Sequence, residues 1–170
     1  IDRITQKMAT YQFEFDRLLE RYRAAAPDAA CLVMLPPDVA PDRKNTGCRK
    51  EMKVDGEKVC IPPTIRSFAG IVAIQRAAAE RAGCAVWDQS QAMGGEGSIR
   101  YWAALDPPLA RGDGVHLTMD GYHLLAEGFF SDLMRTYEIW KNGGEMPLKT
   151  RPITHPSKPK ASRSLGFEVR

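Results

Sequence analysis

The sequence predicts an α/β fold built on a parallel sheet, and three observations support that prediction. Amphipathic helical patterns alternate with short apolar runs along roughly the first 140 residues. The apolar runs are unbroken, as in strands that are buried on both faces. Strands that are joined through helices pair in parallel and carry helices on both faces of the sheet. Only two such runs occur, which is too few for a stable sheet, so we expect the N-terminal strands of the sheet to be missing.

The first predicted element is an amphipathic helix that ends at Pro27-Asp28. Its apolar residues recur at spacings of three and four, and the predicted face is made of Ile4, Met8, Tyr11, Phe15, Leu18 and Tyr22. The first strand follows at 31–35, an apolar run with proline on both sides. Pro36-Pro37 ends that strand, because proline cannot donate to the ladder of a buried sheet.

Residues 38–64 form a long polar loop, which we interpret as an insertion in the domain. Asp55-Gly56 within this loop is a hairpin signal, and a hairpin could bring the sulfurs of Cys48 and Cys60 together. Two interpretations stay open: a Cys48–Cys60 disulfide, or two unpaired thiols in a loop. A disulfide would favour a periplasmic or extracellular location.

A second helix is predicted at about 65–82, with Gly83 as its C-cap. The second strand is the apolar run 84–87, and Asp88 marks its carboxyl end. Cys84 lies in this strand and Cys31 in the first one. We interpret both as free cysteines, because a free cysteine in an apolar stretch behaves as a small hydrophobic residue.

The last predicted helix begins after Thr118, a favourable N-cap residue, and ends at Gly143-Gly144. Its predicted apolar face is made of Tyr122, Leu125, Ala126, Phe129, Leu133 and Tyr137. We therefore place the domain at residues 1–140 and interpret residues 141–170 as a disordered, basic, proline-rich tail. From Glu145 onward six basic residues oppose two acidic ones, so the tail accounts for the formal net charge of +3.

Composition excludes several classes of function. Outside the tail the charge is near neutral, which argues against a surface that binds nucleic acid. No apolar run reaches about 18 residues, so we expect no transmembrane segment. No pair of His or Cys stands at ligand spacing, and no glycine-rich phosphate loop follows a strand. We therefore expect neither a metal nor another cofactor.

Asp113-Gly114-Val115-His116 is the segment with the groups needed for acid–base chemistry. The imidazole of His116 can take a proton from a nucleophile and pass it to a leaving group. Asp113, in a tight turn three residues earlier, can accept the imidazole Nδ1–H and so fix its tautomer. Two such residues in a surface loop are more often solvated polar groups, so the pair alone is a weak signal. The residues that follow it make it stronger.

Asp113, His116, Thr118, Gly121 and Tyr122 match the pattern D-x-x-H-x-T-x-x-G-Y. This block resembles the final block of the SGNH (GDSL-like) hydrolases, which precedes their C-terminal helix. The resemblance implies a partial flavodoxin-like three-layer sandwich that lacks its N-terminal strands. It also implies serine ester hydrolysis with a catalytic Asp and His, on a small acyl ester or an O-acetylated glycan. The blocks that hold the serine nucleophile and the oxyanion-hole donors are not found.

The nucleophile must therefore come from an upstream segment, and we expect this chain alone to be inactive. The stretch at 84–102 is similar to a bacterial subgroup related to peptidoglycan and polysaccharide O-acetylesterases, which implies a periplasmic or extracellular location. Within it Gly94, Gly95, Ser98 and Trp102 are candidate substrate-binding residues, the last as a wall for stacking sugars. Tight turns, a loop hydroxyl and core packing explain them equally well. The alternative function is a non-catalytic, degenerate or split relative that binds a glycan or a partner.

Overall fold

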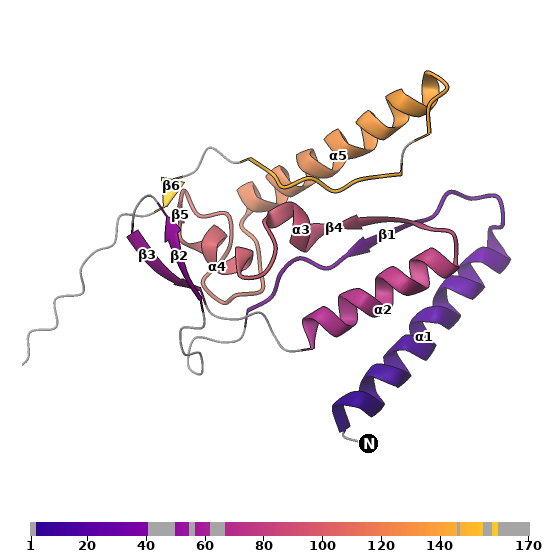
Figure 1. The fold of residues 1–170 in the computed structure, drawn as a ribbon, viewed down its shortest axis with the longest axis horizontal. Coiled ribbons are helices and arrows are strands. Elements are labelled where there is room, and N and C mark those ends of the chain that lie inside the picture. The colour runs from indigo at the N-terminus through magenta and orange to yellow at the C-terminus, as the bar shows by residue number, and fades with distance from the viewer. Residues whose placement is uncertain are drawn as a thin grey trace, which may run out of the picture.

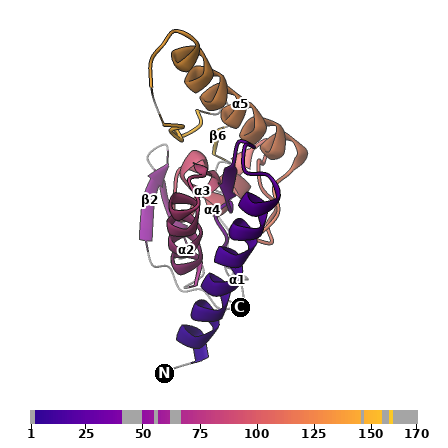
Figure 2. The ribbon, with the colours of Figure 1, turned by 90° about the vertical axis from the view of Figure 1, so that its right-hand side faces the viewer.

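A computed structural model describes residues 3–40, 50–54, 57–61, 67–145, 147–154 and 158–159 (Figure 1). Helices α1 (Arg3–Ala25) and α2 (Phe68–Arg81) lie side by side on one face of a short sheet, as Figures 1 and 2 both show. Helix α5 (Met119–Lys141) lies on the opposite face. The result is three layers, with helices on both sides of the strands.

The sheet consists of β1 (Leu32–Leu35) and β4 (Ala85–Asp88), which pair in parallel. Helix α2 makes the crossover between the two strands. In this register Val33 lies opposite Val86, and Met34 lies opposite Trp87. The predicted α/β fold with a parallel sheet is confirmed, because the alternation of helix and strand produces a crossover rather than a hairpin.

One core fills the space between the sheet and the α1–α2 layer. Its buried residues are Leu19, Val33, Leu35, Ala78, Ala79 and Cys84. The predicted first helix is present, but its inner face differs from the predicted one in its second half. Leu18 and Tyr22 are exposed, and Leu19 is buried in their place. Arg23, one turn further on, donates from Nε and Nη2 to the carbonyls of Ala82 and Gly83 and so joins α1 to the end of α2.

Cys31 and Cys84 form a disulfide, with their Cα atoms 4.6 Å apart. The interpretation of these two residues as free cysteines is therefore wrong. Each lies one residue ahead of a strand, at the same end of the parallel pair. Pairing of the strands brings the two Cα atoms within disulfide range, which the sequence separation of 53 residues conceals.

The predicted insertion contains the hairpin expected from Asp55-Gly56. Strands β2 (Lys50–Val54) and β3 (Glu57–Ile61) pair antiparallel, and Glu51 lies opposite Cys60. Cys48 lies outside the described residues, and no side chain of the hairpin is described. The Cys48–Cys60 disulfide therefore stays a prediction.

A second core lies under α5, around two short helices, α3 (Gln89–Met93) and α4 (Ser98–Ala103). It is built on large apolar side chains, chiefly Trp87, Ile99, Trp102, Leu105, Leu117 and Leu125. Strand β5 (Leu105–Asp106) follows α4 and pairs with β6 (Lys158–Pro159). The ring of Trp87 meets that of Phe129 edge to face, with centroids 5.2 Å apart, which fixes α5 on the sheet.

Residues 147–154 pack against the domain, so the prediction of a disordered tail is wrong for this segment. Thr150 is buried and its Oγ1 accepts the backbone N–H of Asp88. The carboxylate of Asp132 on α5 accepts hydrogen bonds from the backbone N–H and the Nε of Arg151. Composition concealed this packing, because a few specific hydrogen bonds of Thr150, Arg151 and Ile153 hold a segment whose overall character is polar and proline-rich. Residues 155–157 and 160–170 lie outside the described part of the chain.

Candidate active site

The loop that holds Asp113 and His116 is bonded to two other segments and closed by a hydrogen bond of its own. Ala40, in the segment that leaves the carboxyl end of β1, donates its N–H to the carbonyl of Gly114 over 2.9 Å. Arg100 on α4 donates from Nη1 to the carbonyl of Gly112 over 2.7 Å. The loop closes on itself where Arg111 N–H donates to His116 O. The loop therefore lies beside the carboxyl end of the sheet, where active sites of open α/β folds gather.

Asp113 and His116 point toward each other. The distance from His116 Nδ1 to Asp113 Oδ2 is 2.8 Å. The other carboxylate oxygen, Oδ1, accepts the backbone N–H groups of Val115 and His116 at 2.9 and 3.0 Å. The carboxylate is thus held by the backbone of its own turn, and it presents one oxygen to the imidazole.

These contacts determine the charge of Asp113. The N–H groups of His116 and Val115, and then the imidazole, stabilise the ionised carboxyl and hold the pKa of Asp113 well below its usual range. A carboxylate at this distance from Nδ1 assigns the proton to Nδ1 in the neutral imidazole. That tautomer leaves the lone pair of Nε2 free to accept a proton from a nucleophile.

The site is open. The side chains of His116 and Asp113 are 61% and 45% exposed. Among the described residues, Asp113 is the only hydrogen-bond partner of the His116 ring, and no hydroxyl or thiol meets Nε2. The residues present can orient an imidazole and keep it ready to accept a proton. No described residue places at Nε2 the hydroxyl or thiol that would donate that proton.

Two further residues of the sequence block build the frame of the loop. Thr118 Oγ1 accepts the N–H of Gly121, which caps α5, and donates to Pro108 O over 2.8 Å. Gly121 has to be glycine, because a Cβ there would lie 1.9 Å from Leu109 O. Thr118 is confirmed as the N-cap of the last helix. Together these contacts fix the start of α5 against the segment that precedes the Asp–His turn.

Gly114 allows the turn itself to form. Its φ of +79° lies in the left-handed region, and a Cβ would meet Ala40 O at 2.8 Å. A side chain would therefore push the turn away from the segment that follows β1.

Sequence reasoning missed two residues that position the site. Asp38 is fully buried after β1, and its carboxylate accepts the N–H of Ile99 in the first turn of α4. Arg100, in the next position of α4, holds Gly112. The two contacts relate β1, α4 and the Asp–His loop to one another. Asp38 lies three residues after β1, just beyond the carboxyl end of a strand, and that position is the sequence signal for it. The sequence around Arg100 gives no such signal.

The structure places the four predicted substrate-binding residues in surroundings that differ in burial. Trp102 has no exposed surface and lies in the second core, so the prediction that it forms a wall for sugars is wrong. Ser98 is buried at the first residue of α4, which disfavours a ligand contact. Its Oγ meets no hydrogen-bond partner among the described residues, so the alternative of a loop hydroxyl bonded to the backbone is not observed either. Gly94 and Gly95 have positive φ and end α3 in a tight turn. Their approach to a substrate stays a prediction.

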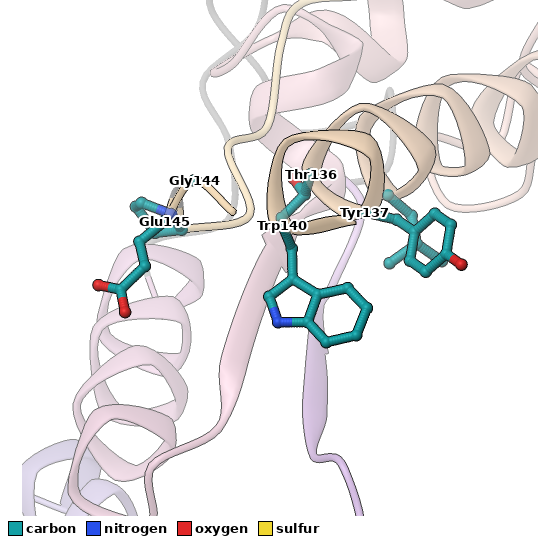
Figure 3. Close-up of a pocket in the computed structure, with 7 residues that line it drawn as sticks. Thr136, Tyr137, Trp140, Gly144 and Glu145 are labelled. Atoms are coloured by element: carbon teal, nitrogen blue, oxygen red, sulfur yellow. The ribbon is translucent and has the colours of Figure 1, made fainter. Parts of the chain in front are cut away.

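Helix α5 borders a groove at its far end, away from the Asp–His loop. It is lined by Leu133, Thr136, Tyr137, Trp140, Gly144, Glu145 and Pro147. Figure 3 shows Trp140 and Tyr137 projecting from the helix and Glu145 on the neighbouring segment. Trp140 is 67% exposed. The lining is mainly apolar, and its described residues include no serine, cysteine or histidine.

The described residues contain no group of three His, Cys, Asp or Glu side chains placed to hold a metal ion. None of their helices is long and apolar enough to cross a membrane.

The alternating helices and strands and the parallel sheet define an α/β protein. Likeness to a solved structure supports a partial SGNH-like fold. A solved structure of a peptidoglycan O-acetylesterase is similar to this chain, with 25% sequence identity and a TM-score of 0.58. The likeness covers 79% of this chain and 33% of that one, so the match spans about a third of the esterase's length. Neither a scan against protein-family models nor a search of curated proteins finds a match.

Proposed function

We propose that this chain is the C-terminal part of a serine ester hydrolase of the SGNH class. The observation that carries the proposal is the 2.8 Å contact between His116 Nδ1 and a carboxylate fixed by its own backbone turn. Its position beside the carboxyl end of the sheet and the likeness to a peptidoglycan O-acetylesterase support the same function. His116 is the general base and Asp113 orients it.

The proposed reaction begins at a serine hydroxyl that an upstream segment supplies. Nε2 of His116 takes the hydroxyl proton as the serine oxygen attacks the carbonyl carbon of the ester. The protonated imidazole then gives that proton to the leaving oxygen as the ester C–O bond breaks. Water attacks the acyl-serine with the same assistance, which releases the carboxylic acid and restores the serine. Asp113 stays ionised throughout and stabilises the imidazolium.

The substrate class follows from the likeness to that esterase. We propose an acetyl ester on a cell-wall or other polysaccharide, which is hydrolysed to acetate and a free sugar hydroxyl. The disulfide between Cys31 and Cys84 supports a periplasmic or extracellular setting, since such bonds persist where the environment is oxidising. The 170-residue chain alone is expected to release no acetate above background.

The test is acetate release from O-acetylated glycan by the parent polypeptide, which includes the upstream segment. Replacing His116 by Ala is expected to lower kcat by about three orders of magnitude or more, because it removes the base of a coupled triad. The matched control is His123→Ala, since His123 is an exposed histidine on α5 outside the site. Equal acetate release by the wild type and His116→Ala would contradict the proposal, whereas a wild-type parent polypeptide that releases no acetate would favour the non-catalytic alternative.

A further inference from the structure

The Asp113–His116 loop is the tip of a short antiparallel pair of segments. Ala110 and Leu117 form a bridge in antiparallel register. Arg111 N–H donates to His116 O over 2.7 Å, so Arg111 lies opposite His116, one step nearer the tip. Side chains that are directly opposite in such a pair stand on the same face, with Cβ atoms about 5 Å apart. The register therefore sets the side chain of Arg111 beside that of His116.

The burial of these four residues follows the same alternation. Ala110 and Leu117 are each 2% exposed and belong to the second core. Arg111 is exposed, and the side chain of His116 is 61% exposed. Successive residues of an extended segment face opposite sides. Arg111 and His116 thus share the solvent face of the loop, from which a substrate would reach the imidazole.

The guanidinium of Arg111 forms no ion pair or hydrogen bond within the part of the chain that the structure describes. Arg100 also borders the turn, but it donates to the carbonyl of Gly112. The carboxylate of Asp113 is engaged by its own backbone turn and by His116. An uncompensated positive charge beside an imidazole disfavours the imidazolium that the proposed reaction has to form. A negative group on the substrate would neutralise that charge.

We propose that Arg111 is a specificity-determining residue that binds a carboxylate of the acetylated glycan. The planar fork of N–H donors in a guanidinium matches the two oxygens of a carboxylate. Because Arg111 stands next to His116, the bound carboxylate belongs to the acetylated sugar or to a group attached to it. The substrate class is an O-acetylated glycan that carries carboxylates. This inference rests on the proposed function, since it names the substrate of the same site.

The test compares two substrates that differ only in the carboxylate. They are O-acetylated oligomers of galacturonic acid and of galactose, matched in length and in degree of acetylation. Acetate release by the parent polypeptide gives kcat/KM for each oligomer. Arg111→Gln is expected to lower the ratio of kcat/KM for the carboxylated over the neutral oligomer about five- to thirty-fold, because a charge-assisted pair is lost.

The neutral oligomer should respond to the same substitution in the opposite direction. On this substrate kcat of Arg111→Gln is expected to rise about two- to threefold, because a like charge at about 6 Å from the imidazolium is removed. Arg111→Lys should keep part of the preference for the carboxylated oligomer, since it retains the charge without the fork. A side chain that only held the loop in place would lower kcat equally on both oligomers, and that result would overturn the proposal.

Arg21→Gln is the matched control, because Arg21 is an exposed arginine on α1, outside the site. It removes the same charge from the protein and is expected to leave the ratio as in the wild type. An equal fall of the ratio in the two variants would mean that net charge sets the preference, and would overturn the proposal. Added salt should weaken the preference of the wild type, since it screens an exposed charge.

O-acetylated peptidoglycan, which carries carboxylates on its peptides, identifies the source of the carboxylate. A lower kcat/KM of Arg111→Gln on the galacturonic acid oligomer places the bound carboxylate on the sugar ring. A loss on peptidoglycan alone places it on the peptide. No loss on either carboxylated substrate would overturn the proposal.

Binding without catalysis separates this inference from the proposed function. Calorimetry measures the Kd of the deacetylated galacturonic acid oligomer and of deacetylated peptidoglycan fragments for the parent polypeptide. If the wild type binds either one several-fold more tightly than Arg111→Gln but releases no acetate, the carboxylate site stands and the proposed function fails. Acetate release that is insensitive to the substitution of Arg111 on every substrate would keep the proposed function and overturn this inference.

Discussion

The two faces of β1 differ in how far the rest of the chain covers them. Val33 and Leu35 are buried under α1 and α2, whereas Leu32 and Met34 on the opposite face are exposed. All four side chains are large and apolar, so the composition of the strand does not distinguish its faces. The comparison teaches that burial here depends on which elements are present beside the strand. The face of β1 toward α1 and α2 is part of a packed core. The opposite face carries apolar side chains of similar size, but no described element covers them.

The largest expected effect tests the two faces directly. Replacing Leu35 by Ala should lower the free energy of unfolding by about 2–5 kcal/mol, because it leaves a cavity in a packed core. The matched change on the open face, Met34→Ala, should cost well under about 1 kcal/mol in the 170-residue chain, since little packing is lost. Urea denaturation measures both. Equal losses for the two variants would show that the open face is covered in solution.

A second prediction compares substitutions of a buried and an exposed residue of helix α5. Asp132 accepts hydrogen bonds from Trp87 Nε1 and from Arg151, while the adjacent Leu133 is exposed. Replacing Asp132 by Asn should cost about 1.5–3 kcal/mol, because hydrogen bonds to a buried charge are lost and residues 147–154 are released. Leu133→Ala is the control, with a smaller effect in the 170-residue chain. Thermal and urea unfolding measure the difference.

The effect of Asp132 should depend on pH. Burial favours the neutral acid, but the hydrogen bonds from Arg151 and Trp87 outweigh it and hold the pKa of Asp132 below its ordinary value. The carboxylate therefore stabilises the folded state at a pH above the unfolded-state pKa of about 4. This stabilisation is lost as the pH falls through the lower pKa that Asp132 has in the folded state. The gap between the wild type and Asp132→Asn should be largest at neutral pH and shrink in acid. A gap that widened below pH 4 would contradict this sign.

The smallest expected effect concerns the frame of the Asp–His loop. Gly121→Ala forces a Cβ against Leu109 O and should cost about 1–3 kcal/mol, the range of overpacked cores. Gly70→Ala in α2 is the matched control, because its Cβ would meet only the flexible end of Met8 at 3.6 Å. That change should be neutral or stabilising by about 0.5–1 kcal/mol, since alanine favours a helix interior. Calorimetry resolves the opposite signs.

Local patterns in the sequence predicted most of the elements and the centre of the site. The spacing of apolar residues located α1, α2 and α5, and the turn Asp55-Gly56 located the hairpin of β2 and β3. Asp113 and His116 could be found because their contact is made within one turn, so their spacing in sequence already sets their distance. Arg100 could not, because its contact with Gly112 depends on the placement of α4.

The remaining errors share a physical cause, which is contact between residues far apart in the chain. Cys31 and Cys84 are joined across 53 residues, and the pairing of two strands was needed to bring them together. Trp102 has an aromatic face that suits a sugar as well as a core, and only its surroundings in α4 decide for the core. The same holds for residues 147–154, whose composition is that of a solvated segment.

What the sequence determined by itself is what short-range geometry controls: helix periodicity, the positions of the short strands, the hairpin of β2 and β3 and the carboxylate–imidazole pair in the Asp113–His116 loop. The tertiary structure alone decided which faces are covered, which cysteines are bonded and where the sheet stays open. Local conformation depends on neighbours within about one turn, whereas burial depends on whichever segments fold against a surface, and those can lie at any distance along the chain.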